Sequence, residues 1–198
     1  GLDDVVDKFP EPVLKVGEVV GNISAEAAEI FGLSKKTVVV EGTADCNACM
    51  FGVGGVRPNG MTLIGGTSTC LLGLSEEEFH VDGVNGTYPN CMYDGTSLLE
   101  GGQTAAGSIL TWFKNNLLPA AWMQEAVNRN MNIYDLITEK ASAVPIGCDG
   151  LVMMDYFQGN RAPYADSKAR GMFWGLSIGT TPAHLARAVY EGVAYGAN

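Results

Sequence analysis

The most constraining feature of the sequence is the stretch at residues 38–74, which holds two short apolar runs that each end in a turn of glycine and hydroxyl residues. The first run, residues 37–40, is a continuous apolar segment, short enough to be a strand buried on both faces. A Gly-Thr turn follows, and Asp45 then lies where a helix of small residues is expected at residues 45–53. The sequence therefore places a lone acid at a junction between a strand and a helix.

The second run, residues 61–64, breaks at a Gly-Gly-Thr-Ser-Thr turn at residues 65–69 and resumes as residues 70–74. One interpretation is a plain hairpin turn. The other is a phosphate-binding turn, because backbone N–H groups and hydroxyls in such a turn bind phosphate oxygens. The turn is not a Walker A loop, since no Gly-Lys-Ser/Thr follows at the required spacing. Together with Asp45, it predicts a cleft with a base on one side and a phosphate cradle on the other.

Asp45 itself has two interpretations. A carboxylate at a helix N-terminus is favoured by the helix dipole alone, so a capping role explains its position. An Asp beside a glycine-rich turn can also accept a hydroxyl proton during phosphoryl transfer, which would make it a general base.

Composition excludes several classes of function. The chain has 198 residues, 46% of them apolar, and a net charge of −10, which argues against a nucleic-acid or acidic-membrane surface. It contains neither a run long enough to span a membrane nor a basic and apolar leader. Five cysteines without scaffold spacing favour reduced thiols and a cytoplasmic location. The oligomeric state stays open, a homodimer included.

Periodicity and turn signals predict the remaining elements. A turn at residues 57–60 is the best candidate for a domain boundary. The chain lacks an initiator Met and ends while still in helical period, so we expect it to be a piece of a longer protein. The expected helices are residues 25–31, 45–53, 103–117, 120–129, 133–143 and 182–198, and the expected strands are residues 37–40, 61–64, 69–74, 90–98, 151–157 and 171–177.

The cysteines and histidines give weaker signals. Cys46-x-x-Cys49 resembles half of a zinc or redox site, but the partner pair is missing. Buried small thiols are the favoured interpretation, and we assign no metal ligand. His184 lies in the first turn of the last helix, where we expect a structural hydrogen bond.

Taken together, five segments resemble the FGGY family of carbohydrate kinases, in the ribulokinase-like and xylulokinase-like branch. The resemblance depends on their order and spacing, because any one of them alone is weak. The segments are Gly42-Thr43-Ala44-Asp45; Gly66-Thr67-Ser68; Glu100-Gly101-Gly102-Gln103-x-x-Ala106-Gly107-x-x-Leu110-x-Trp112; Gly159-Asn160-Arg161-Ala162-Pro163 with Asp166 and Ala169-Arg170; and Gly171-x-Phe173-x-Gly175-Leu176 followed after seven residues by His184-Leu185-x-x-Ala188-Val189-Tyr190-Glu191.

The resemblance implies an α/β fold of the actin-like ATPase (ribonuclease H-like) type, with a mixed sheet flanked by helices, present here in incomplete form. Residues 1–57 would be the tail of the first, sugar-binding domain, and residues 58–198 most of the second, nucleotide-binding domain. The opening strand turn of the family, most of its sugar contacts and its adenine-binding motif would lie outside the sequence.

The same resemblance implies an ATP-dependent sugar kinase in which Asp45 deprotonates the attacking hydroxyl. Gly66, Thr67 and Ser68 would hold the β/γ-phosphates, Gly107 would let the nucleotide approach its helix, and Mg²⁺ would bridge phosphate oxygens. Thr111 would lie on the side of the cleft that binds the nucleotide.

Two departures affect the substrate that the resemblance implies. Cys46 stands where glycerol kinases have a polyol-contacting Gln, and Thr111 stands where they have a nucleotide-contacting Gln. These differences argue against glycerol and favour a pentulose or a related open-chain sugar.

Two alternatives from other classes remain. One is a non-catalytic actin-like module that binds nucleotide as a switch or assembly element. The other is a thiol redox protein built on Cys46 and Cys49. The sequence determines neither the sugar nor the phosphorylated hydroxyl, and we expect the 198-residue piece alone to be inactive as a kinase.

Overall fold

The computed structural model describes residues 3–9, 11–78 and 80–197. The chain forms two compact units. The first comprises residues 1–60, 73–79 and 87–98, and the second comprises residues 61–72, 80–86 and 99–198.

The first unit begins with a 3₁₀ helix at Val6–Lys8, followed by an antiparallel pair of strands, β1 (Val19–Asn22) and β2 (Val38–Val40). Helix α1 (Ala25–Phe31) connects the two strands, and α2 (Asp45–Gly52) follows β2. Helix α1 has the predicted bounds. The Ser24 hydroxyl accepts the Ala27 N–H over 3.1 Å at its start, and Gly32 ends it in the left-handed conformation at φ 65°.

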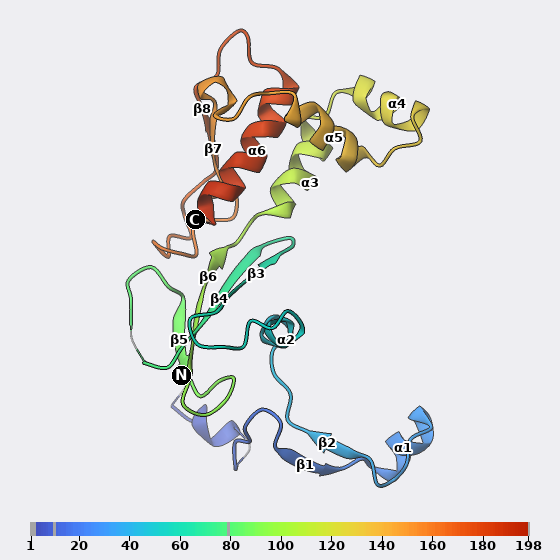
Figure 1. Cartoon of the computed structure of the whole chain (residues 1–198), viewed down its shortest axis with the longest axis vertical. Helices are drawn as coiled ribbons and strands as arrows, with labels where there is room; N and C mark the ends of the chain where they lie inside the picture. Colours follow the sequence, from blue (N-terminus) through green and yellow to red (C-terminus); the bar gives the residue numbers. More distant parts are fainter. Residues whose placement is uncertain (1–2, 10, 79, 198) are drawn as a thin grey trace. The chain divides into compact units, whose positions relative to one another are not determined.

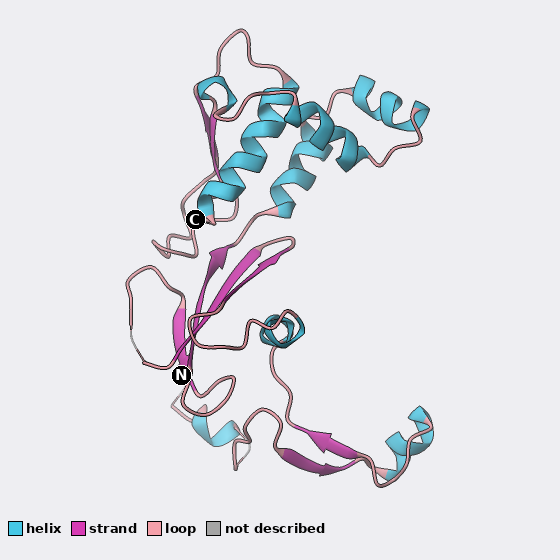
Figure 2. Cartoon of the chain, in the orientation of Figure 1, coloured by secondary structure: helices cyan, strands magenta, loops and turns pink. Residues whose placement is uncertain are grey.

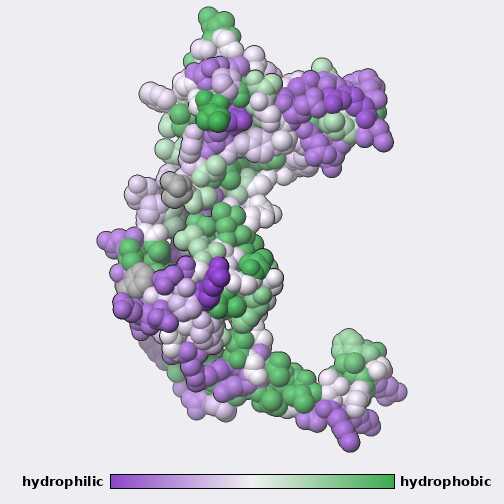
Figure 3. All heavy atoms as spheres, in the orientation of Figure 1, coloured by the Kyte–Doolittle hydropathy of each residue, from purple (hydrophilic) through white to green (hydrophobic). Residues whose placement is uncertain are grey.

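The prediction that residues 37–40 are buried on both faces is wrong. All three valines of β2 are exposed, and Val19 and Val20 on β1 are exposed as well. Figure 3 shows this hydrophobic surface in green over β1 and β2. A two-stranded sheet has no second layer of its own, so valines on either face stay in contact with solvent.

A four-stranded sheet has the strand order β3-β4-β6-β5 (Figure 2). Its strands are β3 (Met61–Gly65), β4 (Thr69–Ser75), β5 (Gly86–Pro89) and β6 (Ser97–Gln103). The two strands that flank the Gly-Gly-Thr-Ser-Thr turn are therefore present as predicted. The strand predicted at residues 90–98 is wrong, because Asn90 has φ 55° and donates its N–H to the Thr96 carbonyl oxygen over 2.7 Å, which makes this segment a turn.

The second unit adds four α-helices and one 3₁₀ helix among the described residues, together with a small antiparallel sheet. In Figure 1, β7 and β8 run beside α6. A buried apolar cluster that includes Ile109, Phe113, Ile137 and Val189 joins α3, α5 and α6. The elements are α3 (Gly107–Asn116), α4 (Ala120–Asn128), α5 (Ile133–Ser142), a 3₁₀ helix at Cys148–Gly150, β7 (Val152–Met154), β8 (Met172–Trp174) and α6 (Pro182–Gly196).

The helix predicted at residues 103–117 begins four residues later than expected. Residues 97–103 pair as β6 beside β4, and Gly102 makes this possible with φ 148°. A Cβ at Gly102 would overlap the Thr69 carbonyl oxygen. Strand pairing between neighbouring backbones therefore overrides the helical period that the apolar residues suggest.

Helices α4 and α5 differ in burial. Helix α4 is largely exposed, but α5 buries Leu136, Ile137 and Ala141 and contributes to the core. None of the helices in the described ranges combines the length and the apolar character that a membrane span requires.

Candidate functional site

The Gly-Gly-Thr-Ser-Thr turn is anchored to the start of α3. Gly66 closes the turn by donating its N–H to the Ser68 carbonyl oxygen over 2.9 Å. The Thr67 carbonyl oxygen accepts the N–H groups of Ala106 and Ser108 over 2.9 and 3.2 Å, and the Ser108 hydroxyl over 2.9 Å. The turn thereby supplies acceptors for donors that the beginning of a helix leaves without internal partners.

Gly107 brings helix and turn into contact. Its N–H donates to the Gly66 carbonyl oxygen over 2.9 Å. A Cβ at Gly107 would lie 2.6 Å from that oxygen and 3.3 Å from the Gly66 carbonyl carbon. Any side chain here would push the turn away from α3, so the site requires glycine.

The outer side of the turn offers hydrogen-bond donors. Gly66, Thr67 and Ser68 are all exposed. Within the described ranges, the N–H groups of Thr67 and Ser68 donate to no protein acceptor. Exposed N–H groups next to two hydroxyls are suited to an anion such as phosphate.

A cavity of about 420 Å³ adjoins the turn and is lined by Thr67, Gly107, Ser108 and Thr111, with no carboxylate among them. The Thr111 hydroxyl lies 3.3 Å from the Tyr134 hydroxyl. This hydrogen bond, together with the Lys114 ammonium 5.3 Å from the ring centroid, lowers the pKa of Tyr134. Three of the five residues predicted on the nucleotide side thus line one cavity: Thr67, Gly107 and Thr111. Gly66 accepts the hydrogen bond from Gly107, and Ser68 is exposed on the same turn.

A second cavity, of about 340 Å³, also meets Gly66 and Gly107. Its lining is mostly apolar and includes Leu63 from β3 and Val193 from α6. Gly107 therefore lines both a cavity bordered by hydroxyl-bearing residues and a mostly apolar cavity.

Asp45 belongs to the first unit and is the first residue of α2. It is exposed, and its Oδ1 accepts the Cys46 N–H over 2.8 Å. Asn47 is buried below it and donates to the Thr43 hydroxyl over 3.3 Å, which ties the Gly-Thr turn to the helix. This geometry holds the carboxylate at the helix start and leaves it accessible to solvent.

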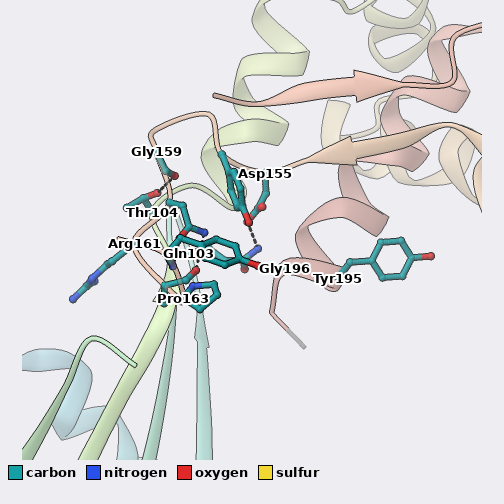
Figure 4. Close-up of a pocket in the computed structure, with 12 residues that line it drawn as sticks. Gln103, Thr104, Asp155, Gly159, Arg161, Pro163, Tyr195 and Gly196 are labelled. Atoms are coloured by element: carbon teal, nitrogen blue, oxygen red, sulfur yellow. Dashed lines mark hydrogen bonds between the residues drawn. The ribbon is translucent and has the colours of Figure 1, made fainter. Parts of the chain in front are cut away.

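Sequence reasoning missed a polar pocket of about 180 Å³ in the second unit (Figure 4). Gln103 at the end of β6 and Asp155 just after β7 meet there, and both are more than nine-tenths buried. Gln103 Nε2 donates to Asp155 Oδ2 over 2.6 Å and to the Val193 carbonyl oxygen over 3.0 Å. An acid that ends the apolar run Leu-Val-Met-Met was the available signal, because such a side chain needs a partner when its strand is buried.

The loop at residues 159–164 forms one wall of this pocket. Thr104 holds it by donating its hydroxyl to the Gly159 carbonyl oxygen over 3.0 Å. Arg161 pairs with Glu100 at 2.5 Å, so its charge is already compensated. Burial, followed by the charges of Asp155 and Tyr164, raises the pKa of Tyr156, which therefore stays a protonated donor at neutral pH.

The cysteines differ from the expectation of buried thiols. Cys148 is fully buried, but Cys49 is exposed and Cys46 is half-buried. Among the described residues, no three side chains of the kinds His, Cys, Asp or Glu converge as a metal site.

The comparison with protein families decides the assignment. Residues 61–198 match the model of the C-terminal domain of FGGY carbohydrate kinases. The chain belongs to the FGGY family of carbohydrate kinases. Similar curated proteins include a ribulokinase from Staphylococcus aureus, 34% identical over 192 residues, and ribulokinase 2 from Staphylococcus saprophyticus, 36% identical over 196 residues. These matches cover 97% and 98% of the chain but only 35% and 36% of the relatives, so the chain spans about a third of their length.

Comparison with solved structures of FGGY kinases identifies the fold. Xylulose kinase from Rhodospirillum rubrum matches with a TM-score of 0.76 and 31% identity over 97% of this chain and 38% of that chain. Gluconate kinase from Lactobacillus acidophilus also matches with a TM-score of 0.76, at 25% identity over 92% of this chain and 35% of that one. The predicted α/β fold of the actin-like ATPase type is confirmed.

In this FGGY chain the last of the five family-like segments, the signature at residues 171–191, has a structural role. A Cβ at Gly175 would overlap the Gly150 carbonyl oxygen, and Gly175 has φ 93°. His184 Nδ1 accepts the Thr181 N–H over 3.3 Å at the start of α6, and its Nε2 lies 3.2 Å from Asp149 Oδ2. The structural hydrogen bond predicted for His184 is therefore confirmed.

Glu191 closes the same signature. Its Oε1 accepts the Arg187 Nε–H over 2.7 Å and the Gly147 N–H over 3.1 Å. The signature residues thus fix α6 to the loop before β7, which positions the wall of the apolar cavity.

Proposed function

We propose that the full-length protein transfers phosphate from ATP to a hydroxyl group of a pentulose or a related open-chain sugar. The observation that carries this proposal is the turn at residues 65–69, which is hydrogen-bonded to the start of α3. In it, Thr67 and Ser68 are exposed, and their N–H groups donate to no protein acceptor among the described residues. Membership of a carbohydrate kinase family supports the reaction class. Relatives named ribulokinase and xylulose kinase support the choice of sugar.

Gly66, Thr67 and Ser68 would hold the β/γ-phosphates, with Gly107 and Thr111 along the nucleotide. The residues present fit this ligand, because the cavity beside Thr67 contains no carboxylate and the cavity beside Leu63 is apolar. A molecule with an anionic end and a flat apolar end suits that pair of cavities. Bound Mg²⁺ would supply charge neutralisation on the phosphates.

Asp45 would act as the general base for the attacking hydroxyl. Asp45 is exposed, and among the described residues its carboxylate accepts one hydrogen bond, from the adjacent Cys46 N–H, so it is able to accept a proton. In this proposal residues 1–57 close the sugar-binding domain and residues 58–198 form most of the nucleotide-binding domain, which the family match at residues 61–198 supports. The cytoplasmic location is part of the same proposal and rests on cysteine usage.

The test is a phosphotransfer assay of the full-length protein against pentuloses, hexuloses and polyols. We expect turnover of a pentulose, and we expect Asp45→Asn to lower kcat by about 10²- to 10⁴-fold while ATP binding persists. Glu41→Gln is the matched control, because it removes an exposed charge four residues away.

Two results would contradict the proposal. Normal turnover by the Asp45→Asn variant would show that another group takes the proton. A wild-type protein that binds ATP but phosphorylates no sugar in the panel would instead be a non-catalytic actin-like module.

A further inference from the structure

The pocket in Figure 4 contains a buried carboxylate with few donors. Asp155 is only 8% exposed. In the part of the chain that the structure describes, its carboxylate accepts one hydrogen bond, from Gln103 Nε2, and no Lys, Arg or His pairs with it. A carboxylate has about four acceptor positions, and leaving a buried charge short of donors is costly. We therefore expect this carboxylate to accept further hydrogen bonds, from a ligand or from water.

The carboxylate is held in a fixed position. Gln103 Nε2 donates both to Asp155 Oδ2 and to the Val193 carbonyl oxygen, so two acceptors determine the orientation of the amide. Gly196 lies against this contact. A Cβ there would overlap Gln103 Nε2 and lie 2.6 Å from Asp155 Oδ2. Gln103 is thus a positioning residue, and glycine at the end of α6 leaves it room.

The rest of the lining indicates which ligand fits. Arg161 is neutralised by Glu100, which leaves Asp155 as the uncompensated charge of the pocket and disfavours an anion. No metal cluster forms among the described residues, which disfavours a cation site. Three hydroxyl-bearing residues, Thr104, Tyr156 and Tyr164, also line the pocket, and the Thr104 hydroxyl donates to the Gly159 carbonyl oxygen. A small neutral molecule rich in hydroxyl groups matches this chemistry.

We propose that Asp155 binds neighbouring hydroxyl groups of a polyol in this pocket. The first source of these hydroxyl groups is the acceptor sugar. In that case the inference rests on the proposed function, and Asp155 is a residue that recognises the substrate. The second source of the same chemistry is the ribose of the nucleotide. The experiment separates the two by using a pentitol in one arm and adenosine in the other.

The experiment measures ribitol and adenosine binding to the full-length protein by titration calorimetry. Asp155→Asn keeps an acceptor for Gln103 but removes the charge, so we expect it to weaken binding of the polyol by about tenfold or more. Gly196→Ala should weaken it as well, because its methyl group displaces the Gln103 contact. Asp135→Asn is the matched control, because it removes one exposed charge from α5 of the same unit.

Loss of ribitol binding in Asp155→Asn assigns the pocket to the sugar, and loss of adenosine binding assigns it to the ribose. Unchanged affinity for both overturns the inference, and so does saturable Mg²⁺ binding that depends on Asp155 while neither polyol binds. A crystal structure of the wild type soaked with the two polyols decides the matter if the variants do not fold, since a polyol seated away from Asp155 also overturns it. Ribitol bound at Asp155 in a protein that phosphorylates no sugar would refute the proposed function and leave this site intact.

Discussion

The N–H of Gly107 donates to the carbonyl oxygen of Gly66 over 2.9 Å, and no side chain fits between the two backbones. This contact joins the loop between β3 and β4 to the first turn of α3. The turn satisfies donors at the helix start, and in the described part of the chain the N–H groups of Thr67 and Ser68 donate to no protein acceptor. Phosphate binding in this proposal therefore depends on backbone geometry more than on charged side chains.

Gly107→Ala should reduce ATP affinity. The added methyl would lie 2.6 Å from the Gly66 carbonyl oxygen, so the turn must move and its N–H groups lose their alignment. We expect affinity to fall by about tenfold, equivalent to about 1.4 kcal/mol. Gly101→Ala is the control, because a Cβ there meets nothing within 4 Å. Equal ATP affinity of the two variants in a calorimetric titration would contradict the role of the turn.

Gly192→Ala should destabilise the protein although alanine favours helices. A Cβ at this buried position of α6 would lie 2.5 Å from the Met153 carbonyl oxygen of β7. Overpacking of this kind costs about 1–3 kcal/mol, which exceeds the gain of about 1 kcal/mol in helix propensity. Gly52→Ala, where a Cβ meets nothing within 4 Å, should leave the free energy of unfolding unchanged or slightly higher. Chemical denaturation of both variants measures the difference, and a stabilised Gly192→Ala protein would refute the packing argument.

The ion pairs between α4 and α5 should stabilise the fold only above acidic pH. Arg129 pairs with Glu125 at 3.0 Å and with Glu139 at 2.7 Å, and Lys140 pairs with Glu125 at 2.9 Å. The hydrogen bond from Lys140, followed by that from Arg129, lowers the pKa of Glu125, and the bond from Arg129 lowers the pKa of Glu139. Because both pKa values are depressed in the folded state, the stabilisation is present above the ordinary value of 4.5 and is lost as pH falls through the folded values.

Arg129→Met tests this pH dependence. Its unfolding midpoint should lie below that of the wild type at neutral pH. The difference between the two midpoints should shrink as the pH falls below the ordinary glutamate pKa. Arg170→Met is the control, since Arg170 donates to the backbone carbonyl oxygens of Ser167 and Ala169 and its effect should not change over this range. A gap that is constant with pH would show that Arg129 acts through packing alone.

Cys49 should react with a thiol reagent in the native protein and Cys148 should not. Cys148 is fully buried, its thiol donates to the His184 carbonyl oxygen over 3.0 Å, and burial, followed by the charge of Glu191, raises its pKa. Cys49 is exposed. Peptide mass spectrometry after brief alkylation should find the label on Cys49, and on Cys148 only after denaturation. Rapid native labelling of Cys148 would mean that the segment before β7 opens readily.

Local signals predicted the elements that local chemistry controls. Ser24 and Gly32 bound α1 as expected, because capping bonds and a left-handed glycine act within a few residues. The Gly-Gly-Thr-Ser-Thr turn lies between two strands for the same reason. The order of the motifs was also enough to indicate the FGGY family, which the match at residues 61–198 confirms. The roles of all six predicted site residues remain predictions: Asp45, Gly66, Thr67, Ser68, Gly107 and Thr111.

The tertiary structure decided what depends on contacts between distant segments. Pairing of β6 beside β4 moved the start of α3 to Gly107, and the lack of a covering layer left the valines of β2 exposed. Gln103 and Asp155 are 52 residues apart and meet only because β6, β7 and α6 bring them together. The sequence by itself determined the caps of α1, the Gly-Gly-Thr-Ser-Thr turn and the family, because these depend on short spacings. A buried pocket brings together polar side chains that are far apart in the sequence. Their meeting depends on long-range packing, so no local sequence pattern predicts it.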